Sequence, residues 1–109
     1  MMVHRPDPDD TRSTLAGIER DLHTLKTDLE QLELEYQLFF TGQRKRPPTA
    51  LRARVEGLVR RLDRASISGS GDRFRFSTLQ HRFRTFANLW DRGLRAREEG
   101  RPGPFSGQA

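Results

Sequence analysis

The chain contains no cysteine among its 109 residues. Disulfides, thiol catalysis and cysteine-based metal sites are therefore excluded, and this composition is typical of a reducing compartment. No apolar run approaches the roughly 18 residues that a membrane-spanning helix needs. The first ten residues have no apolar signal core and carry Asp7, Asp9 and Asp10. We expect a soluble cytoplasmic protein without a transmembrane segment.

Apolar residues are also scarce, at 33% of the chain. A chain of this length forms one domain with a single modest core. Its apolar share, even with glycine added, lies below that of an ordinary globular domain. We therefore expect oligomerisation or a bound partner to contribute to its stability.

Acidic side chains become rare after residue 40. Residues 1–40 hold four basic and nine acidic side chains, whereas residues 41–109 hold sixteen and six. Eighteen of the twenty cationic residues are arginine. Arginine pairs bidentately with carboxylates and phosphates, although a GC-rich genome would enrich it equally well. The basic balance of the second part of the chain therefore either suits carboxylate or phosphate partners or reflects genome composition alone.

A repeating apolar pattern organises the first part of the chain. Eight apolar residues follow one another at alternating spacings of three and four: Leu15, Ile18, Leu22, Leu25, Leu29, Leu32, Tyr36 and Phe39. This spacing predicts a helix over about 12–41 whose apolar seam packs against other helices, and it specifies no chemistry. The helix should end at Thr41-Gly42, because glycine adopts the left-handed cap cheaply.

Two further helices follow at the same periodicity. The first, over about 49–66, begins after a basic Pro-Pro turn and carries an apolar face that includes Val55 and Leu62. The second, over about 72–99, follows a Ser/Gly linker and presents an aromatic seam. Its start is open, because Asp72 could cap it, while Ser77 with Gln80 makes a capping box.

Both ends of the chain have compositions that cannot form a core. Residues 1–10 read as a disordered arm and residues 101–109 as a disordered tail. A single helical domain then spans residues 11–100. The sequence predicts an all-α fold, either a three-helix antiparallel bundle or a coiled-coil hairpin with a third helix.

The charges beside the seams indicate which helices pair. The flanking residues of the first helix are mostly acidic: Glu19, Asp21, Lys26, Asp28, Glu33 and Glu35. Those of the other two helices are basic and include Arg52, Arg54, Arg61, Arg75 and Arg82. We expect the first helix to lie against the other two rather than against a copy of itself. Leu34 and Leu38, off its seam, lie between the other helices in this arrangement, or else form a patch for another chain.

Basic residues away from the seams are the candidate functional residues. Three adjacent cations occupy the turn before the second helix, and three arginines recur every eleven residues, on one line about 33 Å long, along the third. A solvated surface is the simpler alternative for both groups, because Asp91 could pair with Arg95 and because Glu98 and Glu99 interrupt the basic end of the third helix. Of the aromatic residues in the third helix, only Phe74 is off the seam. The candidate contacts for a partner or a nucleic acid are Arg44, Lys45, Arg46, Arg73, Arg84 and Arg95.

Residues suited to catalysis or metal binding do not cluster in the sequence. His4 lies in the N-terminal arm, His23 is one turn from Glu19, and His81 is far along the chain. Two distant histidines and one carboxylate do not make a metal site. The chain also lacks phosphate-loop and dinucleotide motifs. We expect no catalytic residue, no metal and no cofactor.

Three segments resemble parts of short helical proteins from myxobacteria and related predatory bacteria. They are the stretch 34–42, the Arg-Pro-Pro turn at 46–48, and Arg73-Phe-Arg-Phe76 followed by Leu79, Arg82, Phe83 and Trp90. The resemblance covers about half of the chain. It implies a three-helix arrangement and supplies no catalytic residue or ligand.

These observations favour a non-enzymatic interaction or scaffold module, binding a protein partner or a second copy of itself. The alternative is a nucleic-acid-binding protein that uses the basic turn and the surface of the third helix.

Overall fold

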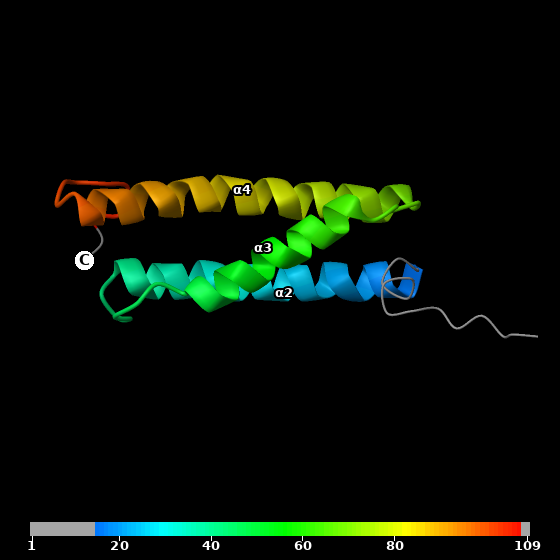
Figure 1. The fold of residues 1–109 in the computed structure, drawn as a ribbon, viewed down its shortest axis with the longest axis horizontal. Coiled ribbons are helices and arrows are strands. Elements are labelled where there is room, and N and C mark those ends of the chain that lie inside the picture. Colours follow the sequence, from blue (N-terminus) through cyan, green and yellow to red (C-terminus); the bar gives the residue numbers. More distant parts are fainter. Residues whose placement is uncertain (1–14, 108–109) are drawn as a thin grey trace, which may run out of the picture.

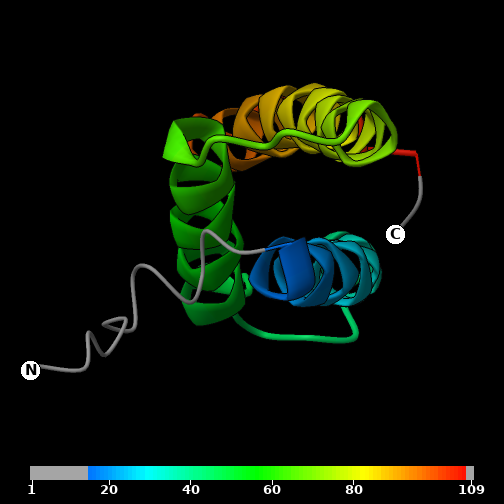
Figure 2. The ribbon, with the colours of Figure 1, turned by 90° about the vertical axis from the view of Figure 1, so that its right-hand side faces the viewer.

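The computed structural model describes residues 15–107, in which three helices form a bundle. They are α2 (Leu15–Phe40), α3 (Thr49–Arg64) and α4 (Ser70–Glu98). Each helix runs antiparallel to the one before it, so α2 and α4 run in the same direction (Figure 1). Viewed along the bundle, α3 lies to one side of both and crosses from α2 to α4 (Figure 2). The predicted all-α three-helix bundle is confirmed.

The helix boundaries differ from the predicted ones by about two residues. The predicted start of α2 lies outside the described residues, and α3 ends at Arg64 instead of residue 66. Helix α4 begins at Ser70, after an extended Gly69, so neither Asp72 nor Ser77 is its cap. Asp72 instead occupies the first turn, where its carboxylate is favourable beside the helix N-terminus and pairs with Arg75 at 3.6 Å.

The predicted seams form the core. Seven of the eight seam residues of α2 are buried, and only Leu15, at its start, is 62% exposed. The buried cluster is completed by Phe40 of α2, by Val55, Leu58 and Leu62 of α3, and by Phe76, Leu79, Phe83 and Trp90 of α4. The rings of Tyr36 and Trp90 stack with centroids 4.2 Å apart, which joins α2 to α4. Burial of each large apolar side chain contributes about 1.5–3 kcal/mol.

Both α2 and α4 end on a glycine in the left-handed region. Gly42 has φ 86°, and the amides of Gly42 and Gln43 donate to the carbonyls of Phe39 and Leu38. The end of α4 repeats this pattern at Gly100, which has φ 65°. These are Schellman turns, in which the last free carbonyls of a helix accept hydrogen bonds. Gly42 ends α2 as its sequence position predicts.

The segment after α4 folds back on the bundle, which differs from the expected disordered tail. The ring of Phe105 stacks on Phe40 of α2, with centroids 4.0 Å apart. A Cβ atom at Gly93 would lie 2.7 Å from Phe105, and one at Gly103 would lie 2.5 Å from the Cβ atom of Ala96. The segment packs because glycines allow this close approach. Residues 108–109 lie outside the described range.

Among the described residues, no helix has both the length and the apolar character to cross a membrane.

Candidate partner and nucleic-acid surfaces

Ion pairs join the acidic flanks of α2 to arginines of both other helices. Asp21 lies 3.3 Å from Arg61 of α3, and Asp28 lies 3.3 Å from Arg54 of the same helix. On the other flank, Glu33 lies 2.8 Å from Arg82 of α4, and this hydrogen bond raises the pKa of Arg82 above its usual value. The predicted pairing of α2 with α3 and α4 through opposite charges is therefore confirmed. Exposed pairs of this kind contribute about 0.2–1 kcal/mol each.

Arg52 connects all three helices. Its Nη1 atom lies 2.8 Å from Oδ1 of Asp91 on α4 and donates to the hydroxyl oxygen of Tyr36 on α2 at 3.1 Å. Its Nε atom lies 3.6 Å from Glu56. Burial alone would lower the pKa of Arg52, because it disfavours the charged guanidinium. The hydrogen bonds to Asp91 and Tyr36 outweigh burial and raise this pKa above its usual range.

Because Arg52 binds both carboxylates, neither of them pairs with the arginine one turn later on its own helix. Asp91 does not pair with Arg95, and Glu56 does not pair with Arg60, within the part of the chain that the structure describes. Arg95 and Arg60 are left exposed at the surface. Asp91 is thus paired with another helix, whereas Glu98, one turn after Arg95, is exposed and forms no ion pair with a described residue.

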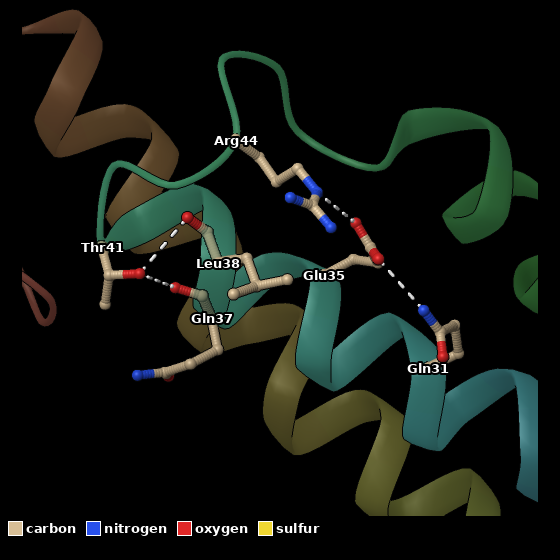
Figure 3. Close-up of polar contacts among 6 residues, drawn as sticks. All are labelled: Gln31, Glu35, Gln37, Leu38, Thr41 and Arg44. Carbon is tan, nitrogen blue, oxygen red and sulfur yellow. Dashed lines mark hydrogen bonds and ion pairs between the residues drawn. The ribbon is translucent and has the colours of Figure 1, made fainter.

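The basic turn between α2 and α3 is partly neutralised. The Nε atom of Arg44 lies 3.4 Å from Oε2 of Glu35, whose other oxygen accepts a hydrogen bond from Gln31 at 3.0 Å (Figure 3). Arg44 is therefore drawn back along α2. Lys45 and Arg46 are exposed, and neither forms an ion pair with another described residue.

The arginines of α4 form the predicted row. Helix α4 extends back past Arg73, so the eleven-residue spacing holds Arg73, Arg84 and Arg95 along one side of a continuous helix. All three are exposed, and none forms an ion pair with a residue that the structure describes. At about 100° per residue they lie roughly opposite Arg82, which faces α2. The row therefore faces away from α2.

The six predicted cations form two separate surfaces. In both views the turn lies on the far side of α2 from α4 (Figures 1 and 2). A single ligand face that joins Arg44, Lys45 and Arg46 to the α4 row is therefore not built by this fold.

The structure also exposes residues that sequence reasoning placed elsewhere or passed over. Leu34 is 50% exposed and Leu38 is partly exposed, so the expectation that α3 and α4 enclose them is wrong. Both neighbours pack on the seam of α2 and its flanks, so neither α3 nor α4 covers the opposite face. Arg92 is exposed beside the α4 row without an ion pair to any described residue. Counting 100° per residue places Arg92 beside the row, and the pairing of Asp91 with Arg52 would have marked Arg92 as a further candidate contact.

Within residues 15–107, no three His, Asp or Glu side chains come close enough together to hold a metal ion. His23 and His81 are exposed, and His4 lies outside the described residues. Comparisons of this chain with protein-family models, with curated proteins and with solved structures find no match. The resemblance to myxobacterial helical proteins and the expected lack of catalytic and cofactor-binding residues stay predictions.

Proposed function

We propose that this protein is a non-enzymatic interaction or scaffold module that docks a helix of a protein partner, or of a second copy, on the outer face of α2. The observation that carries this proposal is the half-exposed Leu34. Leu38 follows one turn later on the same face and is partly exposed. Adjacent apolar side chains on a face that neither α3 nor α4 covers are typical of protein-interaction surfaces.

The surroundings of this leucine pair suit a small interface. Gln31, Glu35 and Arg44 are linked by polar contacts at its edge, and Thr41 closes its far end by donating to the carbonyl of Gln37 at 2.8 Å (Figure 3). An apolar centre with a polar rim is the usual anatomy of an interface. Two leucines bury far less than a standard interface of about 1,600 Å², so we expect a transient complex.

The proposal is tested with Leu34→Glu, and Thr27→Glu serves as the matched control. Thr27 is exposed on the same side of α2, two turns earlier. Leu34→Glu should abolish concentration-dependent self-association in light scattering, or the specific recovery of a protein partner in affinity purification with nuclease, while Thr27→Glu leaves it unchanged. If the unchanged protein, Leu34→Glu and Thr27→Glu associate to the same extent, docking on this face is refuted.

Nucleic-acid binding is the second candidate, and one observation favours it. Five of the six predicted cations, all except Arg44, form no ion pair with a described residue. Unpaired arginines along a helix attract the phosphates of a nucleic acid whatever its base sequence.

A titration with mixed-sequence DNA and RNA, at low and near-physiological salt, tests this candidate. Replacing Arg73, Arg84 and Arg95 with serine should weaken binding equally for all sequences and flatten its salt dependence. Absence of binding at both salt concentrations would remove the candidate.

A further inference from the structure

Phe74 is the most exposed large hydrophobic side chain in the described part of the protein, at 73%. The other aromatic residues of α4 line the core or pack against it, whereas Phe74 makes no ring contact with a described residue. Burial of such a side chain is worth about 1.5–3 kcal/mol, so an exposed position gives up this gain. A ligand that covers the ring would recover it.

Phe74 stands at the beginning of the arginine row. At about 100° per residue, one side of α4 carries Asp91 and, between residues 73 and 95, a set of basic and neutral side chains. All are exposed, and they are Arg73, Phe74, Ser77, His81, Arg84, Asn88, Arg92 and Arg95. The four arginines form no ion pair with a described residue. We call this set the outer face of α4.

Of the four carboxylates near the outer face of α4, two are paired with arginines, whereas Glu98, one turn after Arg95, is exposed and forms no ion pair with a described residue. Asp91 is bound by both terminal nitrogens of Arg52, at 2.8 and 3.1 Å. Glu99, beyond the end of the helix, pairs with Arg101. Asp63 of α3 accepts a hydrogen bond from Gln80 at 3.4 Å at the edge of the face and forms no ion pair with a described residue. The four arginines therefore leave a clear positive excess along about 33 Å of helix.

This combination matches the recognition of single-stranded nucleic acid. A row of cations follows the phosphates, and an exposed aromatic ring stacks on a base whatever its identity. In a duplex, each base is already stacked on its neighbours and its face is closed to a side chain on a straight helix. The arginines alone would suit either form, and Phe74 decides between them.

We propose that the outer face of α4 binds single-stranded nucleic acid, with a base stacked on Phe74 and phosphates bound by Arg73, Arg84, Arg92 and Arg95. This proposal rests on the second candidate function and narrows it to one face and one form of nucleic acid. The basic turn at 44–46 lies across α2 from this face and is not part of the site.

Fluorescence anisotropy with labelled oligomers of about 20 nucleotides tests the proposal on the whole chain. The probes are single-stranded DNA, single-stranded RNA and duplex DNA. Phe74→Ala should weaken binding of single strands by about 5- to 150-fold, the equivalent of about 1–3 kcal/mol per stacked base, and leave duplex binding unchanged. Leu15→Ala is the matched control, because Leu15 is also exposed and apolar but lies on α2. Phe74→Trp should retain affinity and show quenched fluorescence on binding.

A second pair of variants tests the phosphate contacts. Arg84→Gln should weaken binding of single strands and reduce the slope of log affinity against log salt by about 0.7. Arg20→Gln, which removes an exposed cation of α2, should change neither quantity. Both variants alter exposed side chains, so circular dichroism should show the same helix content as in the unchanged protein.

The outcomes separate this proposal from the candidate function on which it rests. Binding that is equal for single strands and duplex and insensitive to Phe74→Ala overturns the stacking site and leaves general nucleic-acid binding in place. Lack of binding to every probe at low salt overturns both. Polyglutamate that competes as well as the oligomers would overturn the proposal in favour of an acidic protein partner. Preference for RNA or for DNA, combined with loss on Phe74→Ala, supports the proposal and names the natural strand.

Discussion

Arg52 of α3 and Asp91 of α4 form a bidentate pair, with nitrogen–oxygen distances of 2.8 and 3.1 Å. The same guanidinium donates to Tyr36 of α2, so one side chain holds all three helices together. Arg52 is also largely shielded, with 16% of its side chain exposed. Its contacts therefore lose less to solvent than those of an exposed ion pair.

Removal of this connection should destabilise the bundle. In Arg52→Met the apolar stem is kept, but Asp91 and the hydroxyl of Tyr36 lose their partner. We expect a loss of about 1–3 kcal/mol in the free energy of unfolding, measured by urea denaturation. Arg60→Met, on the exposed side of the same helix, should change it by less than about 0.5 kcal/mol. Equal stability of the two variants would contradict the role assigned to Arg52.

The packing of Phe105 depends on the absence of a side chain at Gly93. A Cβ atom there would lie 2.7 Å from Phe105 and 2.8 Å from Phe40, so Gly93→Ala must displace one or both rings. We expect Gly93→Ala and Phe105→Ala each to lower the free energy of unfolding by about 1–3 kcal/mol. Because they disturb the same contact, a double-mutant cycle should show a coupling of about 0.5–3 kcal/mol. Additive losses would indicate that the tail and Gly93 act independently.

The pair of Asp28 with Arg54 should be exchangeable. Asp28→Arg places two cations side by side and should lower the midpoint of thermal unfolding, because like charges repel where opposite charges attracted. Adding Arg54→Asp restores an opposite pair and should recover most of the loss. The expected loss in the free energy of unfolding on breaking the pair is about 0.2–1 kcal/mol, the range of an exposed ion pair. Failure of the exchange to restore stability would mean that the pair does not hold α2 against α3.

Two exposed glycines should respond to alanine in opposite ways. Gly42 has φ 86°, so alanine there strains the backbone and should cost about 1 kcal/mol, although its Cβ atom would contact nothing within 4 Å. Gly71 lies in the first turn of α4, and its Cβ atom would also meet nothing within 4 Å. Gly71→Ala should stabilise the protein by up to about 1 kcal/mol, since alanine favours the helix. Urea denaturation should show a lower free energy of unfolding for Gly42→Ala and a higher one for Gly71→Ala.

The sequence by itself determined the three helices, the buried side of each and the partners of α2. Apolar residues such as Leu25 and Phe83 repeat with the helical period, and burial of that stripe is the dominant gain in folding. The opposite flanking charges then predict that Asp21 and Asp28 meet arginines of another helix. Local periodicity and charge suffice for these inferences because both follow from which residues share a helix face.

Only the tertiary structure decided which groups remain free for a ligand. Spacing within one helix favours Arg95 for Asp91. The crossing of α3 instead brings Arg52 to that carboxylate and leaves Arg95 without an ion pair to any residue that the structure describes. The same packing exposes Leu34 and gives Phe105 a place between Phe40 and Gly93. Contacts between residues far apart in the chain depend on the angle and depth at which helices pack. Periodicity along a single helix does not encode that geometry.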